Sequence, residues 1–72
     1  MSSSEEEYER EVRRRSADWE FIESQPPKIR AALKLFVETG DVRLAQKVSG
    51  LPLEEFYEIR RRARIPVVIL RD

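Results

Sequence analysis

A row of arginines closes the last helical pattern of the chain, at Arg60, Arg61, Arg62 and Arg64. Guanidinium groups bind phosphate oxygens, so such a row can contact the backbone of a nucleic acid. A tyrosine precedes the row in the same pattern, and two further bases stand on the preceding one. The candidate DNA-binding residues are therefore Arg43, Lys47, Tyr57, Arg60, Arg61, Arg62 and Arg64.

Three carboxylates at the start of the same helical pattern oppose this interpretation. Glu54, Glu55 and Glu58 stand where a DNA-recognition helix contacts bases, and together they would repel phosphates. Glu58 and Arg62 also have the spacing of an ordinary helical ion pair. The arginines could instead meet the acidic residues at the front of the chain. DNA binding and its absence both remain open from these residues.

The sequence does not predict an enzyme. It contains no histidine or cysteine and no glycine-rich phosphate loop, which removes the usual near-neutral bases, nucleophiles and phosphate cradles. Glu54 and Glu58 share a helix face and could hold a metal through oxygen, but two such carboxylates are far more often solvated. We expect no catalytic residue, metal or cofactor.

Three short amphipathic helices must position the candidate residues, over residues 27–39, 41–49 and 52–63. Pro27 suits a first helical turn, Gly40 and Gly50 suit left-handed C-terminal positions, and Asp41 suits an N-cap. The apolar periodicity predicts a set of inward side chains. These are Ile29, Ala32, Leu33, Phe36 and Val37, then Leu44, Ala45 and Val48, then Leu51, Leu53, Phe56, Ile59 and Ala63.

The second and third helices have the dimensions of a helix-turn-helix unit. A small residue is needed where the helices cross, a glycine in the turn, and hydrophobes after it. Ala45, Gly50, Leu51, Phe56 and Ile59 meet these needs. The alternative is a helical bundle with a glycine turn and no DNA function.

The front of the chain has the opposite charge to the rest. Residues 1–24 carry a net charge of −4 and residues 25–72 a net charge of +4. We expect an acidic helix over 1–24, extending to about Glu23 with an alternative break at Ser16, and a helix-turn-helix-like module over 25–72. The apolar stripe of that helix is Tyr8, Val12, Trp19 and Ile22. Arg13, Arg14 and Arg15 are interpreted as a solvated helix face rather than a nucleic-acid arm.

Some apolar residues have no evident place in so small a core. The tail Val67–Leu70 is apolar and β-branched after Pro66, which predicts a short C-terminal strand without a second strand to pair with. Leu35 points away from the core stripe. We therefore expect self-association or a protein partner, and the candidate contact residues are Trp19, Leu35, Val67, Val68, Ile69 and Leu70.

The composition predicts a cytoplasmic protein. The chain has no cysteine, no stretch apolar enough to span a membrane, and a serine- and glutamate-rich start unlike a secretory signal.

Several short motifs resemble one known family. These are Ala32–Phe36, Gly50-Leu51, Glu55-Phe56 and Arg64–Val67. Residues 29–69 are similar to short prokaryotic, often archaeal, antitoxin-like proteins with a helix-turn-helix followed by an Ile-Pro-Val tail. Pro52, Gln46 and residues 39–41 depart from the pattern, and the acidic front is not part of it.

This resemblance implies a small protein that binds DNA or neutralises a toxin, with a PIN-type nuclease as a candidate toxin. It supplies no catalytic residues. We expect an all-α fold in which an acidic N-terminal helix precedes a three-helix module and a short strand. The first functional hypothesis is a helix-turn-helix regulator of the antitoxin type, and the alternative is a helical interaction or structural module that does not bind DNA.

Overall fold

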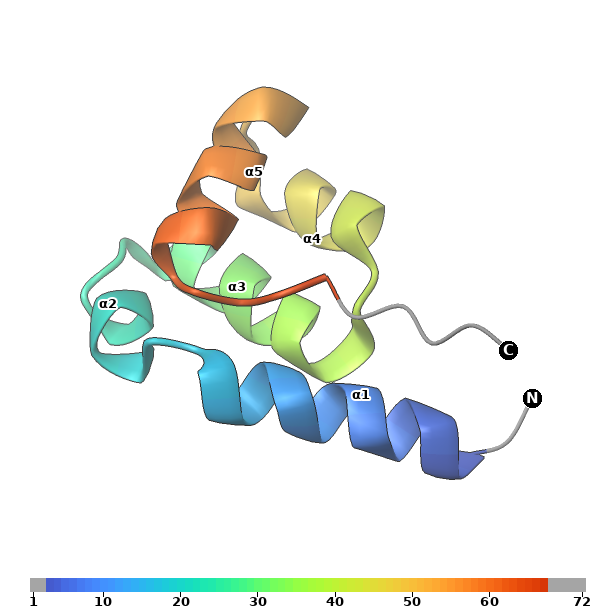
Figure 1. The fold of residues 1–72 in the computed structure, drawn as a ribbon. Helices are drawn as coiled ribbons and strands as arrows, with labels where there is room; N and C mark the ends of the chain where they lie inside the picture. The colour runs from blue at the N-terminus through green and yellow to red at the C-terminus, as the bar shows by residue number, and fades with distance from the viewer. Residues whose placement is uncertain (1–2, 68–72) are drawn as a thin grey trace.

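The computed structural model describes residues 3–67 and is all-helical over that range (Figure 1). Its helices are α1 (Ser3–Ser16), α2 (Trp19–Glu23), α3 (Pro27–Thr39), α4 (Val42–Ser49) and α5 (Leu53–Arg62). The expectation of an all-α fold is confirmed. No strand occurs between residues 3 and 67, and the strand expected at residues 67–70 lies, apart from Val67, outside the described residues.

The acidic front forms two helices rather than one, so the alternative break near Ser16 is the correct version. Asp18 caps α2 by accepting a hydrogen bond from the backbone N–H of Phe21 at 3.1 Å. The N–H of Asp18 donates to the carbonyl oxygen of Ala63 at 2.7 Å, which ties this joint to the end of α5. An N-cap side chain favours a new helix start, and the turn thereby directs Ile22 inward.

Local sequence chemistry fixes the ends of α3 and α4 as predicted. Pro27 opens α3, and Gly40 closes it with a left-handed φ of +71°. Asp41 caps α4 by accepting from the N–H of Leu44 at 3.1 Å, and Gly50 closes α4 with a φ of +74°. Both glycines adopt backbone angles that L-residues rarely take.

The most extensive helix packing is between α3 and α4. The short Gly40–Asp41 link joins the end of α3 to the start of α4. At the other end, the Nζ atom of Lys28 lies only 3.7 Å from where a Cβ on Gly50 would stand. The two helices therefore form an antiparallel hairpin, which we call the α3–α4 hairpin. After the Gly50–Pro52 turn, α5 crosses this hairpin on one side (Figure 1).

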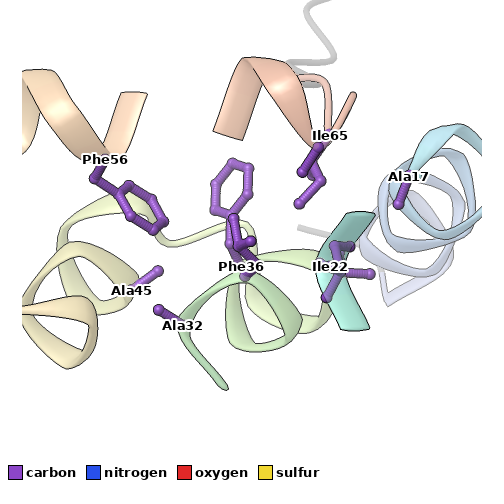
Figure 2. Packing of buried hydrophobic residues seen from close by; sticks show 10 residues of the cluster. Ala17, Ile22, Ala32, Phe36, Ala45, Phe56 and Ile65 are labelled. Atoms are coloured by element: carbon purple, nitrogen blue, oxygen red, sulfur yellow. The ribbon is translucent and has the colours of Figure 1, made fainter. Parts of the chain in front are cut away.

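One core joins α2, α3, α4 and α5 (Figure 2). Phe36 and Phe56 meet edge to face, with ring centroids 6.4 Å apart and planes at 89°, an arrangement that adds to the burial of two aromatic rings. Ala32 and Ala45 are small and fully buried beside Phe56. The cluster also contains Ala17, Ile22, Leu33, Val37, Ala63 and Ile65. Because Ala17 and Ile22 belong to it, the acidic front shares the core of the other helices.

Several predicted inward residues prove to be exposed. Leu44, Val48 and Leu53 are 44%, 37% and 39% exposed, so their assignment to the core was wrong. The helical periodicity identified the apolar rows correctly. It could not identify which rows another helix would cover, because that depends on how the helices cross.

Candidate binding surface

The three arginines of α5 and Arg64, which follows the helix, do not form one cluster. Arg60 donates from Nη1 to the carbonyl oxygen of Ile65 at 2.8 Å, and its guanidinium lies 5.8 Å from the centre of the Tyr57 ring. Burial and the neighbouring Arg61 lower the pKa of Arg60. The buried Nε atom has no hydrogen-bond partner among the described residues. Arg60 therefore fixes the chain after α5 and is a poor phosphate ligand.

Arg61 and Arg62 point to different sides of α5. Arg61 forms an ion pair with Glu58 one turn earlier. The Arg62 guanidinium lies 5.7 Å from the centre of the Phe21 ring, which belongs to α2. Over residues 3–67, the structure shows no ion pair between the α5 arginines and the acidic residues of α1. Within residues 3–67, these arginines therefore meet the acidic front through the Arg62–Phe21 contact rather than through an ion pair.

Arg64 is exposed and occupies a left-handed backbone position, with a φ of 59°. Its N–H donates to the carbonyl of Arg61 at 3.0 Å, and the N–H of Ile65 donates to that of Arg60 at 3.3 Å. These two bonds form a Schellman motif, in which glycine is the usual residue. The chain places an exposed guanidinium at a position where a glycine would be less strained.

A basic row follows one face of α4. Arg43 and Lys47 are one turn apart and exposed. No ion pair or hydrogen bond of either side chain occurs within residues 3–67 of the structure. α4 contains no acidic residue, so this row meets no opposing charge on its own helix. Of the predicted DNA-binding residues, Arg43, Lys47 and Arg64 are thus the most available.

The start of α5 is acidic, as the sequence predicted. Glu54, Glu55 and Glu58 are exposed on its first two turns. An open groove of about 400 Å³ runs beside them, lined by Glu54, Tyr57, Arg60, Arg61 and Val67. Its mixed charge favours neither a phosphate nor a cation. Among the described residues, no three acidic side chains come together as a metal site.

The arginines of α1 hold this helix against the end of α3, a role that sequence reasoning missed. Arg13 is 5% exposed and donates from Nε to the carbonyl oxygen of Val37 at 2.7 Å. Arg10 donates to the carbonyl of Glu38 at 3.2 Å, and Arg14 forms a two-pronged ion pair with the Glu38 carboxylate. Cations at a helix C-terminus meet the negative end of its dipole.

The solvated-face interpretation is correct for Arg15, whereas Arg14 is exposed but pairs with Glu38 of α3, and Arg13 is buried, so the interpretation is wrong for Arg13. Burial lowers the pKa of Arg13, while Glu9 raises it. The signal for this contact was the missing apolar residue in the helical stripe between positions 13 and 16. The long stem of an arginine can fill such a gap while its head reaches a carbonyl.

The predicted partner-binding residues are only partly described. Trp19 is 39% exposed and donates from Nε1 to the carbonyl of Arg14 at 2.9 Å. Leu35 is half-buried, and Val67 is 56% exposed. Val68, Ile69 and Leu70 lie outside the described residues. No helix within residues 3–67 is long and apolar enough to cross a membrane.

Comparison with protein-family models, curated proteins and solved structures found no significant match to this chain. The expected antitoxin resemblance therefore stays a prediction.

Proposed function

We propose that the chain is a small helix-turn-helix regulator of the antitoxin type that binds DNA through α4 and the outer face of α5. The observation that carries this proposal is the packing of α4 and α5. A left-handed Gly50 begins the three-residue link, the buried Ala45 allows close approach, and Phe56 anchors α5 against α3. Such a unit presents its second helix to the major groove and its first helix to the phosphates.

The exposed residues of this unit would contact different parts of the DNA. Arg43 and Lys47 contact phosphates from α4, and Arg64 contacts a phosphate beyond the end of α5. Tyr57 and Arg61 face the major groove of the DNA, after Arg61 leaves its exposed ion pair with Glu58. Exposed ion pairs are worth about 0–1 kcal/mol, so this exchange is not a large barrier. Arg60 and Arg62 support the fold instead.

A second function within the same proposal is the neutralisation of a partner toxin, for which a PIN-type nuclease is the candidate. The carboxylates at the start of α5 and the exposed Leu53 favour a protein contact, because both are unfavourable next to phosphates. A regulator of this type acts in the cytoplasm. No catalytic step is proposed for the chain.

The test is binding of a labelled mixed-sequence duplex to the full chain at two salt concentrations, measured by fluorescence anisotropy. The full chain is required because Ala17 and Ile22 belong to the core. We expect salt-sensitive binding that Arg43→Ala/Lys47→Ala weakens at least tenfold. No binding at low salt, with the helical circular dichroism spectrum intact, would contradict the DNA-binding proposal.

A matched control removes the same amount of charge from another surface. Arg15 on α1 pairs with Glu11 of the same helix, and Lys34 on α3 pairs with Glu23 of α2. Arg15→Ala/Lys34→Ala should leave DNA affinity within about twofold, apart from the nonspecific effect of net charge. An equal loss in both double variants would show that only total charge matters and would exclude a defined α4 surface.

A further inference from the structure

The outer side of the α3–α4 hairpin, away from α5, carries apolar side chains that the fold leaves exposed. α4 buries Ala45 and Ser49, and Gln46 on one flank donates from Nε2 to the carbonyl of Leu51 in the turn toward α5. Leu44 and Val48 are one turn apart on the other flank. At about 100° per residue, this places them on the side of α4 away from α5. They are 44% and 37% exposed.

Leu35 belongs to the same side of the hairpin. It lies seven residues, or two helical turns, after Lys28, so the two side chains share a face of α3. Lys28 reaches Gly50 at the end of α4, which shows that this face borders α4. Lys34 and Glu38, on another face, are held by α2 and α1. Leu35, Leu44 and Val48 together are called the outer patch.

The charges around the outer patch are basic. The hairpin over residues 27–50 carries five bases and two acids, a net charge of +3. Both acids are engaged, since Asp41 caps α4 and Glu38 pairs with Arg14. The bases that border the patch, Lys28, Arg43 and Lys47, form no ion pair within residues 3–67. A ligand of this surface must therefore be apolar in its middle and acidic at its edges.

We propose that the outer patch binds an acidic amphipathic helix of a partner protein. Apolar residues of that helix at i, i+3, i+4 and i+7 would cover Leu35, Leu44 and Val48, while its glutamates and aspartates meet the bordering bases. A second copy of this chain is a poorer fit. A two-fold contact would set each basic border against another basic border. The inference goes beyond DNA binding, which uses the charged row of α4 and not its apolar row.

The test uses two synthetic helical peptides that differ only in charge. The acidic peptide has leucine at i, i+3, i+4 and i+7 and glutamate elsewhere; the basic peptide replaces each glutamate with lysine. Binding of labelled peptides to the full chain is measured by fluorescence anisotropy. The expected result is salt-sensitive binding of the acidic peptide and at least tenfold weaker binding of the basic one. Equal binding of both peptides, or of neither, would overturn the proposal.

Variants then locate the contact. Leu44→Ser/Val48→Ser should weaken binding of the acidic peptide at least tenfold, while the melting temperature and the DNA affinity stay near those of the original chain. Tyr8→Ser removes a more exposed side chain, the 59% exposed ring on α1, and should leave binding of the acidic peptide unchanged. Acidic-peptide binding that survives Leu44→Ser/Val48→Ser would overturn the proposal. So would a concentration-dependent dimer, seen by light scattering, that this double variant abolishes.

The two proposals can fail separately. Arg43→Ala/Lys47→Ala should weaken the binding of both DNA and the acidic peptide, whereas Leu44→Ser/Val48→Ser should weaken only peptide binding. Peptide binding without DNA binding would refute the proposed DNA binding and leave the outer patch supported. DNA binding without peptide binding would do the reverse.

Discussion

Replacing Arg64 with glycine should stabilise the protein. Arg64 has a φ of 59°, and the left-handed conformation costs an L-residue about 1–2 kcal/mol. Glycine avoids this strain, but its more flexible unfolded chain lowers the free energy of unfolding by about 0.4–1 kcal/mol. The Schellman hydrogen bonds use backbone atoms only, so the substitution leaves them intact. We expect a net gain of about 0.5–1 kcal/mol, or about 4 °C in Tm for a domain of this size.

Urea unfolding of Arg64→Gly and Arg64→Ala, followed by circular dichroism and by the fluorescence of Trp19, measures this difference. Alanine keeps the Cβ and hence the strain, and it removes the same guanidinium. Its stability should therefore stay within about 0.5 kcal/mol of the original chain. Equal stability of the glycine and alanine variants would refute a left-handed Arg64. If the exposed guanidinium binds phosphate, both variants should also bind DNA several-fold more weakly.

Further predictions concern the joints of the fold and the face of α5. Arg13→Ala should lower the free energy of unfolding by about 2 kcal/mol, because it removes a buried, charged hydrogen bond to Val37 and its packing. Arg15→Ala, at an exposed ion pair, should change it by less than about 0.5 kcal/mol in the same urea titration. Gly40→Ala should destabilise the protein more than Gly50→Ala, because a Cβ at Gly40 would lie 2.8 Å from the Arg13 guanidinium, whereas a Cβ at Gly50 would lie 3.7 Å from Nζ of Lys28. Equal losses of stability in thermal melts would contradict this packing. Glu54→Gln should tighten DNA binding about twofold at low salt by removing a like charge, and an unchanged anisotropy titration would place DNA away from the start of α5.

The helix ends were predictable because their chemistry is local. Gly40, Asp41 and Gly50 specify left-handed closures and an N-cap through their own backbone and side-chain atoms. Ala45 and Phe56 were also identified as core residues, since each lies in the middle of an apolar row that any packed arrangement must bury. These residues determine the hairpin and the turn that place the candidate surface.

The remaining features depend on contacts between distant segments. Leu44 and Val48 continue the apolar row of α4, but no other helix within residues 3–67 covers that side. Arg13 is buried because α1 crosses the end of α3 and presents it to Val37, a pairing 24 residues apart. Arg60 turns to the carbonyl of Ile65 because the chain reverses after α5. Charge and periodicity show which side chains are available, but the crossing of the helices decides which of them face solvent.

The most direct test of the proposed DNA contact is a titration of the 15N-labelled full chain with a short duplex, followed by NMR. The proposed DNA contact predicts chemical-shift changes concentrated at Arg43, Lys47, Tyr57, Arg61 and Arg64, with the amides of α1 little affected. These changes should disappear at high salt and in Arg43→Ala/Lys47→Ala. Shifts concentrated on α1, or none at low salt with a folded spectrum, would contradict it.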